Sequence, residues 1–97
     1  MSRPTRLSDA EITANLAGLP GWRRAGDTIT KTFTSAGFPE AVAFVTRLVD
    51  PAERLEHHPD LDLRYNRVIV SLSTHDQGGI TGADFTLAAE IEKAAQG

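Results

Sequence analysis

Three segments of the chain repeat apolar residues at the three- and four-residue spacing of an amphipathic helix. The first follows Ser8-Asp-Ala-Glu11, in which Ser8 is placed to cap the helix and Glu11 to complete a capping box. The Gly-Leu-Pro-Gly run at residues 18–21 ends this helix. Its predicted buried face consists of Ile12, Leu16 and Leu19.

The second helical segment spans residues 38–55 and contains Pro51. A proline ring clashes with the carbonyl group four residues earlier, so the sequence predicts a kink or a break near Asp50. The apolar period continues in phase beyond the proline, which favours a kink. The third segment opens with Thr81-Gly-Ala-Asp84, which again has the shape of a capping box. Its predicted buried face consists of Phe85, Ala88, Ile91 and Ala95.

Four shorter segments have the composition or the two-residue alternation of side chains that is typical of β-strands. They lie at residues 22–25, 28–34, 61–65 and 68–74, and the predicted turns are Gly26-Asp27 and Asn66-Arg67. In the last strand one predicted face carries Val68, Val70, Leu72 and Thr74, and the other carries Ile69, Ser71, Ser73 and His75. The order α-β-β-α-β-β-α predicts an α+β two-layer domain, with three helices packed on one face of a four-stranded antiparallel sheet. The other sheet face is expected to be solvated or covered by another subunit.

The composition narrows the class of protein. A chain of 97 residues is long enough for one domain, residues 1–97, whose first six residues are expected to fray. The net charge is −3 without a basic run, which makes nucleic acid a poor partner. No cysteine is present, which excludes disulfides and thiolate metal sites. No signal region or membrane-length apolar run occurs, so we expect a soluble cytoplasmic protein and no membrane partner.

All three histidines, His57, His58 and His75, lie within 19 residues of one another. Imidazole both gives and takes protons near neutral pH, so this clustering favours proton-transfer chemistry over a chance group of surface histidines. Pro59 pushes the residue before it out of the α region, which places His58 in extended geometry and leaves His57 on the last helical turn. Glu53 is four residues before His57 and therefore within its reach on that helix.

An acid and a base on opposite sides of a small substrate can carry out a dehydration. The carboxylate of Glu53 and the helix dipole both favour a protonated His57, the candidate acid, while His58 and His75 are candidate bases. Structural alternatives stay open: Glu53 as a solvated helix charge and Asp84 as a simple helix cap. Zinc bound by the three histidines is disfavoured, because two adjacent side chains point apart and no other metal-binding spacing is present.

The spacing of these residues resembles the signature of the pterin-4a-carbinolamine dehydratases. The matching residues begin with Glu53-x3-His57-His58-Pro59 and continue with Tyr65, His75 and Asp84, and each gap between them has the length found in the signature. The similarity extends to Gly21-Trp22, Phe44-x-Thr-Arg47 and Leu72-Ser-Thr-His75, and so covers nearly the whole chain. The α+β fold of the family agrees with the order of elements expected above.

The resemblance implies dehydration of 4a-hydroxytetrahydropterin to quinonoid dihydropterin during tetrahydropterin recycling, by a hydro-lyase that needs no metal or organic cofactor. It implies His57, His58 and His75 as catalytic residues. It also implies a set of residues that bind or orient the substrate: Glu53, Asp84, Pro59, Tyr65, Ser73 and Thr74. The chain departs from the family pattern at Pro51 and at Leu61, where mammalian members have tryptophan.

Two other functions stay open. Mammalian members of the family also bind a homeodomain transcription factor, so a non-enzymatic interaction module on the same fold is one alternative, and action on another pterin is the second. The resemblance further implies a homo-dimer or homo-tetramer, and an aromatic amino acid hydroxylase as the functional partner that releases the substrate. The free sheet edge gives a physical reason to expect self-association.

Overall fold

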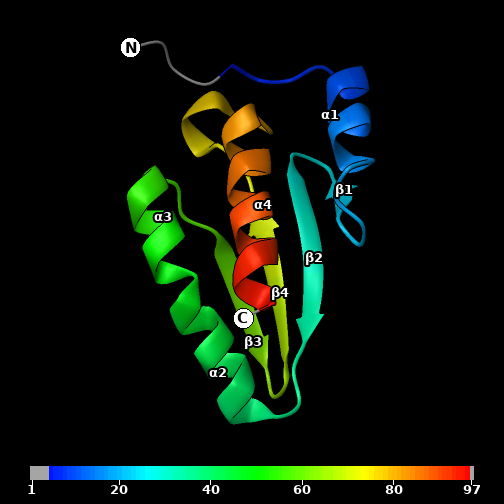
Figure 1. The fold of residues 1–97 in the computed structure, drawn as a ribbon. Helices are drawn as coiled ribbons and strands as arrows, with labels where there is room; N and C mark the ends of the chain where they lie inside the picture. The colour runs from blue at the N-terminus through cyan, green and yellow to red at the C-terminus, as the bar shows by residue number, and fades with distance from the viewer. Residues whose placement is uncertain (1–4, 97) are drawn as a thin grey trace.

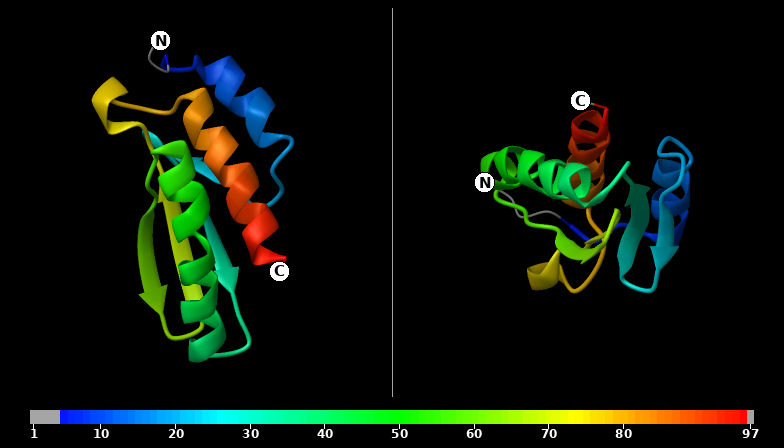
Figure 2. Two further views of the ribbon diagram at one scale, coloured as in Figure 1. Left: turned by 60° about the vertical axis from the view of Figure 1, so that its left-hand side comes forward. Right: turned by 90° about the horizontal axis from the view of Figure 1, so that it is seen from below.

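The computed structural model describes residues 5–96, in which helices cover one face of a four-stranded antiparallel sheet (Figures 1 and 2). The strands lie in the order β1-β2-β4-β3. The elements are α1 (Asp9–Leu16), β1 (Arg23–Ala25), β2 (Thr28–Thr34), α2 (Phe38–Arg47), α3 (Val49–Leu55), β3 (Asp60–Arg64), β4 (Arg67–Leu72), the 3-10 helix η1 (His75–Gln77) and α4 (Gly82–Ala95). This confirms the predicted α+β class and order of elements. None of the helices described is long and apolar enough to cross a membrane.

The hydrophobic core lies between the sheet and the helices. As predicted, Val68, Val70 and Leu72 of β4 point into it and are fully buried, and Ile29 of β2 faces them. The helices complete the core mainly with Ile12, Ala41, Phe44, Leu48, Leu87, Ala88 and Ile91. The opposite sheet face is rich in hydroxyl side chains, because the threonines of β2 and Ser71 of β4 share it.

The segment at residues 38–55, which was predicted as one helix containing Pro51, forms two helices that meet at Leu48. The structure therefore has a break in this region, and the preference for a kink was wrong. Pro51 lies in the first turn of α3, where a missing backbone donor needs no partner within the helix, so the proline begins a new helix instead of bending an old one. Leu48 keeps α-helical dihedral angles, and α3 continues roughly along α2 (Figure 1).

The second corrected boundary is the end of α3. Glu56 adopts the left-handed conformation (φ 51°, ψ 42°), which ends the helix before His57. The amide of His57 then donates back to the carbonyl of Ala52 at 3.0 Å, as in a Schellman motif. His57 was expected on the last helical turn and instead lies beyond it, with a different direction for its ring.

The β3–β4 hairpin turns one residue earlier than predicted, at Tyr65-Asn66. Tyr65 has a positive φ of 52° and so is a turn residue, not the last alternating position of a strand. Asn66 ties the turn to Ser35, the residue after β2: its side chain donates to the carbonyl of Ser35, and its carbonyl accepts from the amide of Ser35.

Both predicted capping boxes are present, at Ser8–Glu11 and at Thr81–Asp84. The buried face of α4 contains Leu87, which the prediction missed, while Ala95 is exposed and was placed there wrongly. Of the six residues expected to fray, residues 1–4 lie outside the described part of the chain. Arg6, another of the six, forms a β-bridge with Thr81.

Candidate active site

The three histidines lie around one end of the sheet, and each directs its Nε2 atom toward a carboxylate. His57 Nε2 lies 2.5 Å from Asp84 Oδ1. His58 Nε2 lies 2.5 Å from Glu53 Oε2. His75 Nε2 lies 4.0 Å from Asp60 Oδ2, an ion-pair distance. In the two hydrogen-bonded pairs, the carboxylate fixes the orientation of the imidazole and leaves the other ring nitrogen free to exchange a proton, whereas the distance between His75 and Asp60 is too long for a hydrogen bond.

The His57–Asp84 pair is the buried one. Asp84 is fully buried, and the side chain of His57 is only 15% exposed. The two oxygens of the carboxylate are used differently. Oδ2 accepts from the backbone N–H of Thr81 at 2.9 Å and from the hydroxyl of Thr74 at 3.0 Å, while Oδ1 faces His57. Asp84 therefore caps α4 and holds a histidine at the same time, so its structural role and a functional one are compatible.

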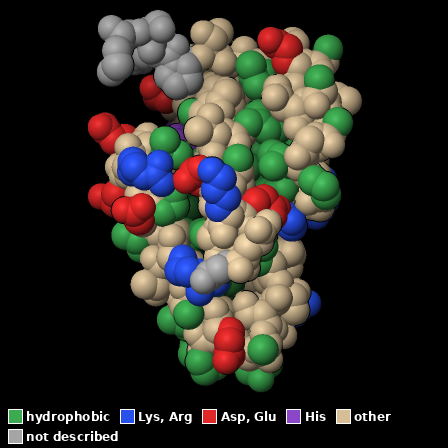
Figure 3. Space-filling model, viewed as in Figure 1, with side chains coloured by type: hydrophobic (Ala, Val, Ile, Leu, Met, Phe, Trp, Pro, Cys, Tyr) green, Lys and Arg blue, Asp and Glu red, His purple; other side chains and the backbone are tan. Residues whose placement is uncertain are grey.

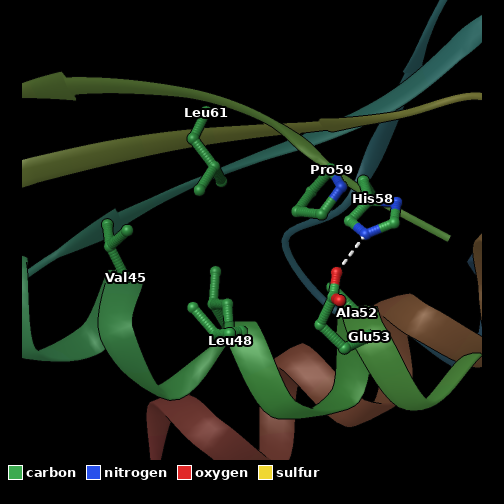
Figure 4. Close-up of a pocket in the computed structure, with 8 residues that line it drawn as sticks. Val45, Leu48, Ala52, Glu53, His58, Pro59 and Leu61 are labelled. Atoms are coloured by element: carbon green, nitrogen blue, oxygen red, sulfur yellow. Dashed lines mark hydrogen bonds and ion pairs between the residues drawn. The ribbon is translucent and has the colours of Figure 1, made fainter. Parts of the chain in front are cut away.

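The His58–Glu53 pair lies at the surface, with both side chains about two-thirds exposed. The sequence predicted that Glu53 would face His57. That prediction was wrong, because the left-handed residue Glu56 turns the chain and brings His58 to Glu53 instead. Figure 4 shows this pair beside Pro59, at one end of a groove between α2–α3 and β3.

The helix that carries Glu53 is tied to the helix that carries Asp84. Arg54 of α3 donates to Glu90 of α4 at 3.0 Å, and Lys93 reaches the same carboxyl group at 3.1 Å. The hydrogen bond from Arg54 lowers the pKa of Glu90, with Lys93 contributing. Figure 3 shows acidic and basic side chains interspersed over these two helices.

The partner of His75 was missed in the sequence. Asp60 is the first residue of β3, directly after Pro59, and it pairs with Ser71 of β4. Alternation places its side chain on the open sheet face, and His75, the first residue of η1 beyond the end of β4, has its Nε2 atom 4.0 Å from Asp60 Oδ2. Both His75 and Asp60 are more than two-thirds exposed, so a solvent-borne molecule can reach them.

The remaining predicted residues fall into two groups. Pro59 lines the groove, and Ser73 is half-buried next to the site. Thr74 is buried, and its hydroxyl contacts Asp84 and Thr81, so it supports the site from behind. Tyr65 lies at the hairpin turn, at the opposite end of β3 from His58, and is not brought to the site.

Among residues 5–96, no three His, Cys, Asp or Glu side chains lie together in a way that could hold a metal ion. The described donors are arranged as separate histidine–carboxylate pairs and do not converge on a point. The chemistry that such pairs offer is proton transfer.

The described part of the chain is thus an α+β domain that places three histidines near carboxylates at one end of its sheet. The model of one family, pterin 4 alpha carbinolamine dehydratase, matches residues 5–94. The chain therefore belongs to the pterin-4-alpha-carbinolamine dehydratase family.

Relatives support this membership over nearly their whole length. A protein of Thermosynechococcus vestitus that carries the provisional name pterin-4-alpha-carbinolamine dehydratase is 56% identical over 90 residues, 93% of this chain and 95% of its own. A protein of Nocardia farcinica with the same provisional name is 47% identical over 90 residues, 93% of this chain and 95% of its own.

Two solved structures share the fold. A transcriptional coactivator/pterin dehydratase from Brucella melitensis has a TM-score of 0.90 and 34% identity, covering 94% of this chain and 99% of its own. A pterin dehydratase-like RuBisCO assembly factor of the alpha-carboxysome has a TM-score of 0.66, covering 79% of this chain and 92% of its own. At 22% identity, the second structure shows a likeness of fold alone.

Proposed function

We propose that this protein dehydrates 4a-hydroxytetrahydropterin to quinonoid dihydropterin, and so acts as a hydro-lyase in tetrahydropterin recycling. Family membership supports the pterin substrate. The observation that carries the proposed mechanism is the set of three histidine–carboxylate pairs around one end of the sheet. A binding or interaction module would have no need of three imidazoles oriented in this way.

The reaction needs two proton transfers. The bond between C4a and the hydroxyl oxygen breaks as that oxygen receives a proton and leaves as water, and N5 loses its proton as the C4a=N5 double bond forms. Substrate and products are at the same oxidation level, so the balance requires no oxidant or reductant. One group that gives a proton and one that takes a proton are sufficient, and each typically contributes about 10²–10⁴-fold.

His57 is suited to one of these transfers. Asp84 holds its Nε2 atom, which leaves Nδ1 as the nitrogen that exchanges a proton with substrate. We assign the second transfer to the exposed histidines, His58 with Glu53 and His75 with Asp60. Their exposure allows the transferred proton to reach solvent in each turnover.

The test compares the wild-type protein with His57→Ala and His75→Ala. An aromatic amino acid hydroxylase generates 4a-hydroxytetrahydropterin in situ, and the rate of dehydration is measured against the spontaneous rate. We expect wild type to accelerate the reaction and both variants to lose most of that acceleration. Gln77→Ala, on the same 3-10 helix as His75, is the matched control and should keep it.

Each contrary result has a defined meaning. Full activity in His75→Ala would remove His75 from the mechanism, and full activity in His57→Ala would do the same for His57. The absence of acceleration by wild type would overturn the proposed activity on this substrate. Parallel assays with other 4a-hydroxylated pterins would then test action on another pterin.

A protein-contact role is favoured by a separate observation. Phe38, Val42 and Val49 of α2 and α3 are 39–57% exposed, which is unusual for large apolar side chains on one helical surface. The related Brucella melitensis protein is described as a transcriptional coactivator as well as a pterin dehydratase. We propose that this chain forms a homo-dimer or homo-tetramer. Light scattering at micromolar concentration tests this, and a monomer would refute it.

A further inference from the structure

The α2–β3 groove runs from the His58–Glu53 pair between α2–α3 and β3, and has a volume of about 210 Å³. Figure 4 shows Val45 and Leu48 on the helical side and Leu61 opposite them on β3. Its lining residues are Val45, Leu48, Val49, Ala52, Glu53, His58, Pro59 and Leu61.

Polar side chains are confined to one end of the groove. Glu53 and His58 form that end, and every other lining side chain is aliphatic or proline. An amide or hydroxyl group placed among those aliphatic side chains would lose its hydrogen bonds to water without finding replacements. The groove therefore favours a ligand with one polar edge, directed at His58, and one apolar edge that extends toward Val45.

A reduced pterin has two such edges. Its pyrimidine ring carries the 2-amino and 4-oxo groups and two further nitrogens, all of which need hydrogen-bonding partners. Its other ring ends in C6 and C7, which are saturated carbons in the tetrahydro form. C6 is bonded to N5, and N5 to the reacting carbon C4a, so a pterin that presents N5 and C4a to His58 can direct C6 and its substituent along the groove. The volume, below the ~300–1,000 Å³ of pockets that enclose a whole ligand, fits one edge of the bicycle.

We propose that the α2–β3 groove binds the C6 substituent of the substrate and selects pterins whose substituent is alkyl over those whose substituent is hydroxylated. This inference rests on the proposed dehydratase function and adds a substrate preference to it. Val45 and Leu61 are the specificity-determining residues, because they form facing walls of the apolar part of the groove.

The test uses two substrates with the same number of carbon atoms in the side chain. They are the 4a-hydroxy derivatives of 6-propyl- and 6-(1,2-dihydroxypropyl)-tetrahydropterin, each generated in situ. We expect kcat/KM to be roughly 10- to 100-fold higher for the propyl substrate, the range in which an apolar pocket rejects added hydroxyls. Equal values, or a preference for the dihydroxypropyl substrate, would overturn the inference and leave the proposed function intact.

A pair of matched variants locates the effect. Val45→Thr places a hydroxyl group inside the groove without changing the shape of the side chain, and should reduce the preference roughly three- to tenfold, as one new hydrogen bond allows. Ala43→Ser also adds a hydroxyl group on α2, at an exposed position that does not line the groove, and should leave the preference unchanged. An unchanged preference in Val45→Thr would show that the side chain binds elsewhere.

Binding separates a failure of this inference from a failure of the proposed function. Fluorescence titration with the stable oxidised compounds, 6-propylpterin and biopterin, measures affinity without any turnover. Tighter binding of 6-propylpterin, weakened in Val45→Thr but not in Ala43→Ser, would support the groove even if wild type accelerated neither dehydration. No binding of either compound would overturn it.

Discussion

The two carboxylate oxygens of Asp84 have different partners. Replacing Asp84 by asparagine should change the contact with His57 while keeping the cap of α4. Oδ2 accepts two hydrogen bonds, from Thr81 and Thr74, and Oδ1 accepts one from His57. In Asp84→Asn the carbonyl oxygen of the amide can take the Oδ2 position and keep both of the first bonds. The amide NH₂ then faces His57 Nε2 and must donate to it.

This reversal changes the tautomer of His57. A neutral ring whose Nε2 accepts a hydrogen bond carries its proton on Nδ1, which is the opposite of the tautomer that Asp84 imposes. Proton exchange at Nδ1 is therefore disrupted whichever of the two transfers His57 carries out. We expect the dehydration rate of Asp84→Asn to fall about 10²–10⁴-fold, the usual contribution of one proton-transferring group. The helix cap survives, so the free energy of unfolding should fall by only about 1–2 kcal/mol.

Asp84→Ala should behave differently, because it removes the acceptor of the buried Thr81 N–H and of the half-buried His57 ring, and one of the two partners of the Thr74 hydroxyl. Breaking a buried ionic contact by removing one partner costs about 3–5 kcal/mol. That cost is a large part of the ~5–15 kcal/mol that holds a small domain folded. Destabilisation of this size would show that the cap formed by Asp84 stabilises the fold as well as the site.

Urea unfolding followed by fluorescence measures these changes, since the single tryptophan, Trp22, is buried in the core. Glu11→Gln alters the equivalent capping box of α1, remote from the histidines, and is the matched control. It should lose about 1 kcal/mol or less and keep full activity. Wild-type activity in Asp84→Asn would refute the proposed role of the His57–Asp84 pair.

Three further predictions concern the exposed pairs. Glu53→Gln should lower the dehydration rate while changing the free energy of unfolding by less than about 1 kcal/mol, because both partners are largely solvated; equal rates in wild type and variant would exclude an orienting role. Asp60→Asn should reduce the rate most at low ionic strength, where an exposed ion pair with His75 is least screened, and Asp62→Asn, on the same face of β3, should not. The lowered pKa of Glu90 means that its contribution to stability is fully present above its unfolded value near 4.5 and is lost as the pH falls through the folded value. The difference in unfolding free energy between wild type and Glu90→Gln should therefore be constant above about pH 5.5 and shrink in acid, and a constant difference down to pH 3 would contradict this.

Much of the fold follows from local chemistry that a single sequence displays. The capping boxes at Ser8 and Thr81 need only a hydroxyl and a carboxylate three residues apart, and both form as predicted. The faces of β4 follow from strict alternation, which ties each side chain to the core or to solvent regardless of neighbouring elements. The observed turn lies one residue earlier than predicted and shifts the pairing of β3 with β4 by two residues, so Leu61 and Leu63 still pair with residues on the core face of β4.

The partners of the histidines depended on something that no pattern displays. Glu53 and His57 are correctly spaced for contact only if the helix continues through Glu56. Glu56 instead takes a left-handed conformation that residues other than glycine, asparagine and aspartate adopt rarely, so neither propensity nor spacing indicated it. One residue in this conformation exchanges the pairs: His58 turns to Glu53, and His57 is directed to Asp84, which is 27 residues later in the chain.

Asp60 is a different case, because its position was available in the sequence. The predicted turn at Asn66-Arg67 would pair Asp60 with Ser73, and the observed turn pairs it with Ser71. These two serines share a face of the strand, and alternation places His75 on that face as well. Either register therefore brings a carboxylate to the side of the sheet that carries His75. A search for carboxylates on the strand next to each histidine would have found it, whereas a search by spacing along one helix could find only Glu53.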